Sequence, residues 1–217
     1  MLLQRKTLTT LLIAMLTVIL AFVLPMQTMA APTLKMGSQS GDVWDLQYRL
    51  QVLGYYQDDL DGSYGPKTYQ AVRQFQKNYG LSVDGVAGEK TWRALKKFSV
   101  NRGEMQMLAQ LVYSEARGES YQGQVAVAAV VMNRLQSNLF PNTVKGVIFE
   151  PLAFTAIADG QYWLTPNKTA YQAAWDAVRG WDPTGNAIYY FNPDTATSKW
   201  IWSRPQIKKI GKHIFAK

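Results

Sequence analysis

A short internal repeat sets the local fold in the first half of this chain. DGSYGPKT at residues 61–68 recurs 23 residues later as DGVAGEKT at residues 84–91, with five of eight positions identical. In each copy the Asp-Gly pair favours a tight turn with positive φ at the glycine, and Pro66 or Glu89 favours the start of a helix. An apolar pattern of helical period, closed by a glycine, precedes each copy. The repeat therefore predicts two stacked units of helix and turn.

Two further helices are predicted in the second half of the chain. In the first, over residues 103–117, Met105, Leu108 and Val112 form an apolar stripe, and Glu115 follows on the same face. The second contains eight consecutive apolar residues at 125–132 and is expected to be buried on most sides. Packing of the two helices would desolvate the Glu115 carboxylate and favour its neutral form. Glu115 is therefore a candidate general acid.

Glu115 and Glu119, at the end of the first of these helices and in the turn after it, also have structural interpretations. For Glu115 the alternative is a buried ion pair with Arg134. Glu119 lies four residues farther on, but Gly118 ends the helix and denies the two carboxylates a shared helical face. Glu119 is expected to serve the N-terminus of the next helix, where negative charge is favourable, with a catalytic role as the alternative.

Composition excludes several kinds of chemistry. The chain has no cysteine and one histidine, His213. Cysteine nucleophiles are excluded, and so are the common zinc hydrolases, because their sites need two or three histidines. No metal or other cofactor is expected. A Ser-His-Asp triad remains open only through His213.

Aromatic residues are interleaved with polar ones near the C-terminus. Residues 149–163 and 186–205 are predicted to be loop and hairpin, with residues 192–197 as the connector of the hairpin. Sugar rings pack on aromatic faces, so one interpretation is a sugar cleft, and the other is that most of these rings form the core. The candidate substrate-binding residues are Phe154, Thr155, Tyr190, Asn192, Lys199 and Trp200.

The N-terminus has the three parts of an export signal. Arg5 and Lys6 precede an apolar run at residues 8–24, and a stretch of small residues follows. Cleavage after Ala30 is expected, with an uncleaved membrane anchor as the alternative. The formal charge of +8 agrees with an anionic partner, either a nucleic acid or a cell wall.

The repeat region resembles the small three-helix type of peptidoglycan-binding domain. The resemblance is carried by LQYRLQVLGYY, DGSYGPKT, AVRQFQKNYGL and DGVAGEKTW, and it covers nearly all of residues 40–95. It implies a module that holds a catalytic domain on the wall. The implied contacts are exposed aromatic residues, with Tyr55, Tyr56 and Tyr64 as candidates.

Residues 104–215 resemble the catalytic domain of the spore cortex-lytic enzymes of the SleB type. The matching strings are YSEARGESYQGQVAVAAVVMNR, VIFEPLAFTAIADG and GWDPTGNAIYYFNPDTATSKWIWSRPQIKKIGKHIF. The resemblance implies a lysozyme-like fold and a lytic transglycosylase acting on spore cortex peptidoglycan during germination, with Glu115 as general acid and base. The family's usual cysteine in the tail is Ala216 here, which argues against a chemical role for that position.

The resemblance also implies surroundings and partners. It places the mature protein on the outer surface of the spore inner membrane and in the cortex, with a spore membrane protein as partner and no nucleic acid. The alternatives are a peptidoglycan hydrolase of muramidase or amidase type, or a wall-binding protein without activity.

The predicted fold is mainly α and has two domains. A signal peptide at 1–30 precedes a three-helix domain at 31–98. A linker at 99–103 then leads to a lysozyme-like α+β catalytic domain at 104–217, which carries a short hairpin.

Overall fold

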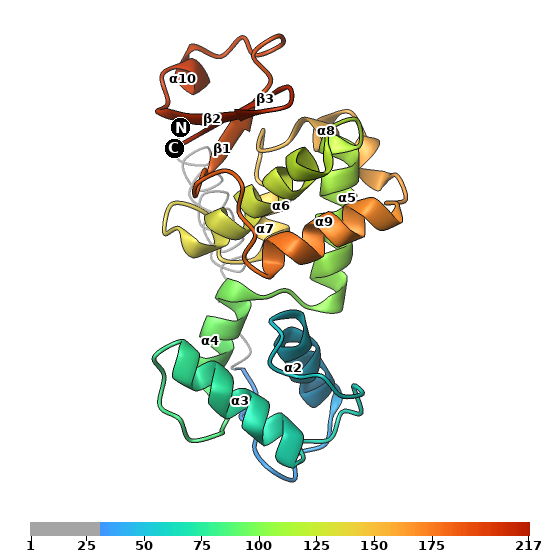
Figure 1. Cartoon of the computed structure of the whole chain (residues 1–217), viewed down its shortest axis with the longest axis vertical. Helices are drawn as coiled ribbons and strands as arrows, with labels where there is room; N and C mark the ends of the chain where they lie inside the picture. The colour runs from blue at the N-terminus through green and yellow to red at the C-terminus, as the bar shows by residue number, and fades with distance from the viewer. Residues whose placement is uncertain (1–30) are drawn as a thin grey trace, which may run out of the picture. The chain divides into compact units, whose positions relative to one another are not determined.

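Two large hydrophobic cores organise residues 31–217, the part of the chain that the computed structural model describes (Figure 1). The first core belongs to three helices, α2 (Gly41–Val52), α3 (Pro66–Asn78) and α4 (Glu89–Phe98). The second is built mainly by α5 (Arg102–Ala116), α6 (Tyr121–Gln136), α7 (Val144–Ile148) and α9 (Lys168–Val178). The predicted export signal lies outside the described residues. Within residues 31–217, no helix has the length and apolar character needed to span a membrane.

A buried glutamine fixes the first copy of the repeat. The Gln47 amide nitrogen donates to Asp61 Oδ1 at 2.7 Å and to Thr68 Oγ1 at 3.1 Å. Its amide oxygen accepts from the backbone N–H of Gly62 at 3.0 Å. Gly62 has φ of +69°, as the tight turn requires. One side chain therefore ties the turn to the helix before it and to the helix after it.

The second copy repeats this arrangement with Gln76. Its amide nitrogen donates to Asp84 Oδ1 at 2.8 Å and to Thr91 Oγ1 at 3.1 Å, and its oxygen accepts from Gly85 N at 2.9 Å. The predicted helix starts at Pro66 and Glu89 are confirmed. The two repeat units share these glutamines, which sequence reasoning missed because a polar residue in an apolar helical pattern gave no sign of its partners.

Two of the three predicted wall-contacting tyrosines belong to the core instead. Tyr56 is 5% exposed and Tyr64 is 2% exposed. The Tyr64 hydroxyl donates to the carbonyl oxygen of Gly85 at 2.7 Å, which joins the two copies of the repeat. The prediction that Tyr56 and Tyr64 are exposed is therefore wrong. Tyr55 is only half-buried, and its role as a wall contact stays a prediction.

The connection between the two cores is shorter than the predicted linker at 99–103. Helix α4 ends at Phe98 and α5 already begins at Arg102. Asn101 caps α5 through its side chain, and Glu104 bonds back to the backbone N–H of Asn101. Because of this reciprocal capping box, the helix begins at Arg102, within the predicted linker.

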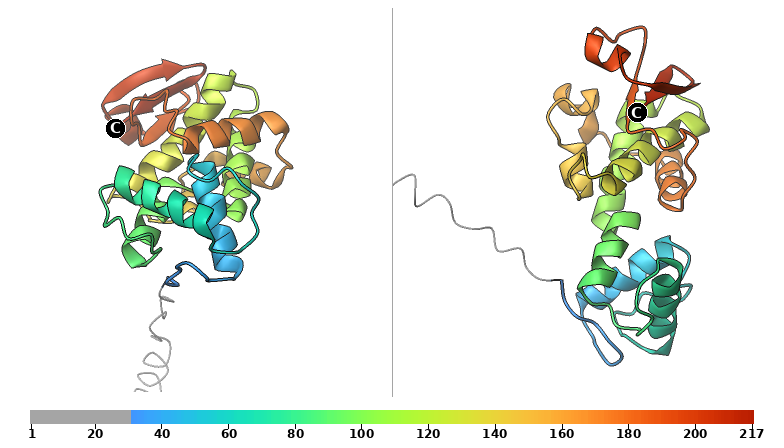
Figure 2. Two further views of the ribbon diagram at one scale, coloured as in Figure 1. Left: turned by 60° about the horizontal axis from the view of Figure 1, so that its bottom comes forward. Right: turned by 90° about the vertical axis from the view of Figure 1, so that its left-hand side faces the viewer.

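The C-terminal sheet has three antiparallel strands, β1 (Tyr189–Phe191), β2 (Gln206–Ile210) and β3 (His213–Ala216), in the order β1-β3-β2. The strands lie together in Figure 2. The apolar side of the sheet packs on α6 through Ile210 and Phe215, which contact Ala126 and Val130.

The hairpin is not where the sequence predicted it. The segment expected to return to β1 forms the short helix α10 (Lys199–Trp202), and β1 pairs with β3 instead. Residues 198–205 expose most of their side chains, whereas Phe215 and Ala216 of β3 are buried, so pairing with β3 covers apolar surface. The fold class itself, mainly helical with a three-helix unit followed by a helical domain with a hairpin, is confirmed.

Candidate active site

The carboxylate of Glu115, in the last turn of α5, accepts hydrogen bonds from three donors. The backbone N–H of Ala156 lies 2.7 Å from Oε1, and the hydroxyl of Tyr190 lies 2.9 Å from Oε2. The hydroxyl of Thr155 lies 3.2 Å from Oε1. The carboxylate oxygens therefore meet polar donors, where sequence reasoning expected apolar neighbours.

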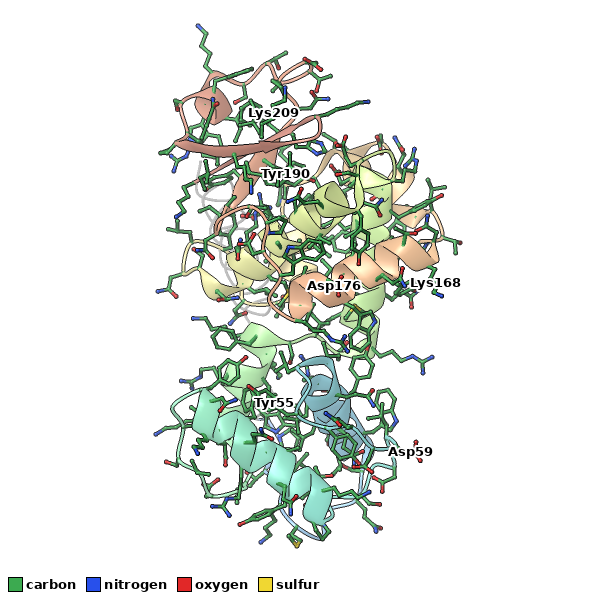
Figure 3. The ribbon with its side chains drawn as sticks, viewed as in Figure 1. Tyr55, Asp59, Lys168, Asp176, Tyr190 and Lys209 are labelled. Carbon is green, nitrogen blue, oxygen red and sulfur yellow. The ribbon has the colours of Figure 1, made fainter. Side chains whose placement is uncertain are left out.

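The donors come from two segments distant in the chain. Thr155 and Ala156 open the short helix α8 (Thr155–Ala158), whose N-cap Phe154 offers no side-chain acceptor. The first N–H groups of a helix have no partner within the helix, and Glu115 accepts one of them. Tyr190 reaches the carboxylate from β1 and lies between the sheet and the helices in Figure 3.

The Tyr190 hydroxyl is held in its donating form. Burial, followed by the charge of Glu115 and the hydrogen bond to it, raises the pKa of Tyr190 well above its ordinary value. The phenol therefore stays protonated at neutral pH. It fixes the orientation of the Glu115 carboxylate and stabilises negative charge on it.

Tyr190→Phe is expected to lower kcat about tenfold, because a hydrogen bond to a charged group contributes about 1.5 kcal/mol. The ring and its packing are kept, so the midpoint of thermal unfolding should stay near that of the native protein. Initial rates on soluble peptidoglycan fragments, measured together with a thermal melt, check this. An unchanged kcat with a lowered melting point would show that Tyr190 is only structural.

A cleft of about 330 Å³ opens beside Glu115. Its lining residues are Ser114, Glu115, Arg117, Gly118, Glu119, Asn192, Lys212 and His213. Of the predicted substrate-binding residues, the structure brings Asn192 to this cleft and Thr155 and Tyr190 to the carboxylate itself.

Glu119, the second acid in this cleft, is bound to the turn between β2 and β3. Its Oε2 accepts from the backbone N–H of Lys212 at 3.2 Å. Gly211 has φ of +57°, which residues with side chains rarely adopt, and a Cβ at that position would lie 1.8 Å from Glu119 Oε2, so a larger residue would be strained and would displace the carboxylate. Ser120, not Glu119, caps α6 by accepting from Gly123 N. The side-chain cap of α6 is therefore Ser120. The Glu119 carboxylate also lies at the first turn of this helix, where a Cβ on Gly123 would be 3.6 Å from its Oε2. The favourable charge expected at the helix N-terminus stays a prediction, and the same carboxylate orders the hairpin.

Two alternatives from the sequence are not realised in residues 31–217. The Glu115–Arg134 ion pair does not form, because the Arg134 Nε donates to the carbonyl oxygen of Ile188 at 2.8 Å and the guanidinium faces aromatic rings. His213 is buried, its Nδ1 has no partner among the described residues, and burial lowers its pKa. No Ser-His-Asp triad is present in this part of the chain.

The remaining predicted substrate-binding residues do not line the cleft beside Glu115. Phe154 is 5% exposed and packs beneath Arg134, so its predicted contact with substrate is wrong. Lys199 is exposed at the start of α10 and makes no described side-chain bond. Trp200 is half exposed and lines a second cleft.

Comparisons with known proteins also divide the chain into two regions, one over the three-helix part and one over most of the part with the candidate site. Residues 39–95 match the model of a family described as a putative peptidoglycan binding domain, and residues 118–216 match one described as a cell wall hydrolase. A spore cortex-lytic enzyme of Bacillus cereus is 50% identical over 219 residues, covering 83% of this chain and 85% of that protein.

Two solved structures are similar to part of the chain. The catalytic domain of the Bacillus cereus SleB protein has a TM-score of 0.53 and 70% identity, and the match covers 55% of this chain and 93% of that one. The catalytic domain of a germination-specific lytic transglycosylase, SleB from Bacillus anthracis, has a TM-score of 0.52 and 71% identity, covering 54% and 97%.

Proposed function

Because this chain belongs to the spore cortex-lytic enzymes, we propose that it is a lytic transglycosylase that cleaves the glycan strands of spore cortex peptidoglycan during germination. The observation that carries the proposal is the Glu115 carboxylate, which opens onto a cleft and is oriented by Ala156, Thr155 and Tyr190. An acid fixed in this way can exchange a proton with a bound sugar.

The reaction uses Glu115 twice. In its protonated form Glu115 donates a proton to the glycosidic oxygen between a muramoyl residue and the next glucosamine, and the bond from C1 to that oxygen breaks. The three donors stabilise the carboxylate that this step creates. The carboxylate then takes the proton of the muramoyl C6 hydroxyl, and the C6 oxygen attacks C1. Glu115 returns to its protonated form, the product is a 1,6-anhydromuramoyl end, and no water is consumed.

The environment of Glu119 favours this mechanism over hydrolysis. Most glycosidases need two carboxylates, one as acid and one as nucleophile or base. The other acid in the cleft is Glu119, and its Oε2 is engaged by the turn at Lys212. A transfer to the sugar's own hydroxyl needs only Glu115.

The three-helix domain and the N-terminus fit an exported enzyme that acts on peptidoglycan. The three-helix domain would hold the enzyme on peptidoglycan, with half-buried Tyr55 as a candidate contact. We propose export by the N-terminal signal, action at the outer surface of the spore inner membrane and in the cortex, and a spore membrane protein as partner. Export rests on the N-terminal sequence, and the other two proposals rest on the family resemblance.

Purified protein added to decoated spores is expected to lower their turbidity and to release glycan fragments with anhydromuramoyl ends. Mass spectrometry of the fragments separates the candidate activities. Reducing ends would indicate a muramidase, free stem peptides would indicate an amidase, and unchanged turbidity would indicate a wall-binding protein without activity.

A further inference from the structure

A second cleft, of about 560 Å³, shares Tyr190 with the site. Tyr190 lines this cleft and donates its hydroxyl to Glu115, so one side chain contacts both the cleft and the proposed acid. Arg134 and Glu150 supply charge to the cleft, and Tyr189 and Trp200 supply aromatic walls.

Arg134 is a buried cation with unused hydrogen-bonding capacity. The residue is 5% exposed, and Nε donates to the carbonyl oxygen of Ile188, but Nη1 has no partner among residues 31–217. The four ion pairs of this part of the chain do not include Arg134. A guanidinium has five N–H donors, and leaving buried donors without acceptors costs free energy.

Aromatic rings compensate only part of this cost. The Arg134 guanidinium carbon lies 4.8 Å from the centroid of Phe140 and 5.0 Å from that of Phe154. Rings attract a cation through their faces but offer no strong hydrogen-bond acceptor. A carboxylate entering the cleft would supply acceptors to the fork of Arg134.

The rim of the cleft is apolar. Leu139 and Leu152 are exposed by 74% and 101%, and Trp200 lies beside them in the lining. Leu152 has φ of +64°, a conformation that side-chain-bearing residues rarely adopt and that tends to occur at functional sites. A ligand that matches the cleft has an aliphatic body and a charged end.

Glu150 adds a second charge of opposite sign. It lines the same cleft, and it is in none of the ion pairs of residues 31–217. A cation and an anion in one cleft complement a group that carries both an ammonium and a carboxylate. The free end of a diamino acid in a peptidoglycan stem peptide is such a group, at the end of a short methylene chain.

We propose that this cleft binds the zwitterionic end of the stem-peptide diamino acid, with Arg134 on its carboxylate and Glu150 on its ammonium. The inference rests on the proposed function, because a muramoyl residue at Glu115 carries its stem peptide to one side of the glycan. The cleft would thereby favour cleavage next to muramoyl residues that bear a peptide.

Binding of two soluble stem peptides to the full chain tests this inference without turnover. One peptide ends in diaminopimelate, and the other has lysine there, which lacks the carboxylate of the side-chain end. Calorimetry on the native protein is expected to show at least tenfold tighter binding of the diaminopimelate peptide. Equal affinities would overturn the inference, and since no cleavage is measured, that result is separate from a failure of the proposed function.

Arg134→Met should remove the preference for diaminopimelate, and Glu150→Gln should weaken binding of both peptides. Arg93→Met is the matched control, because Arg93 is exposed on α4 and, among residues 31–217, forms an ion pair only with Glu89. Preference retained in Arg134→Met would overturn the inference. Should Arg134→Met fail to fold, Arg134→Lys keeps the cation but not the planar fork, and it is expected to lose most of the preference.

Discussion

Glu115→Gln is expected to abolish the release of cortex fragments, lowering the rate by about a thousandfold, because a general acid and base contributes that order of acceleration. The glutamine keeps one oxygen, which can accept from the Ala156 N–H, and its NH2 group can donate to the Tyr190 hydroxyl oxygen, so the fold of the site should persist. Wall binding should be unchanged, since the three-helix domain is untouched. Rates on decoated spores and sedimentation with purified peptidoglycan measure the two properties.

Two further variants sharpen this test. Glu89→Gln, at an exposed position of α4, should keep native activity and controls for the loss of one negative charge. Glu119→Gln should keep most of the activity, because a glutamine oxygen can still accept from Lys212 N. Loss in Glu119→Gln equal to that in Glu115→Gln would favour a mechanism with two carboxylates. Native activity in Glu115→Gln would remove Glu115 from the reaction.

Gln76→Leu is expected to destabilise the three-helix domain by about 3 kcal/mol, because several buried groups lose their partners at once. Gly85 N loses its acceptor, and Thr91 and Asp84 each lose a donor. Urea unfolding and hydrogen exchange of the α3 amides measure the change. Gln74→Leu is the matched control, since Gln74 is exposed two residues earlier on the same helix. Equal effects of the two substitutions would contradict the role assigned to Gln76.

The same variant has a consequence at acid pH. The backbone N–H of Val86 and the Gln76 side chain lower the pKa of Asp84 below its ordinary value. A carboxyl with a lowered folded-state pKa stabilises the fold above its unfolded pKa, and this stability is lost as pH falls through the folded pKa. The native protein should therefore lose stability on acidification below about pH 4, and Gln76→Leu should lose less. Urea midpoints across that range measure this.

Local sequence chemistry was enough for the repeat and the main helices. The Asp-Gly turns and the starts at Pro66 and Glu89 depend on backbone preferences of neighbouring residues, and they were predicted correctly. Burial of Tyr56 and Tyr64 was missed because it depends on how the two repeat units pack together. The partner of β1 was missed for the same reason, since β3 lies more than twenty residues farther along the chain.

The candidate site was only partly visible in the sequence. Glu115 was a candidate general acid because it lies on an apolar helical stripe, and the family resemblance implied its role as general acid and base. The groups that orient it lie 40, 41 and 75 residues away. Tyr190 was predicted to bind substrate, but its hydroxyl contacts Glu115. The donor from Ala156 is a backbone N–H, which no residue type reveals. Such contacts follow from tertiary structure alone.

Cleavage of cortex glycan in water labelled with heavy oxygen tests the central claim most directly. If Glu115 takes the proton of the C6 hydroxyl while the C6 oxygen attacks C1, no water enters the product. The new ends then contain no label and are one water lighter than reducing ends in the mass spectrum. Incorporation of one labelled oxygen at each new end would show that water attacks C1, and it would contradict the single-carboxylate mechanism.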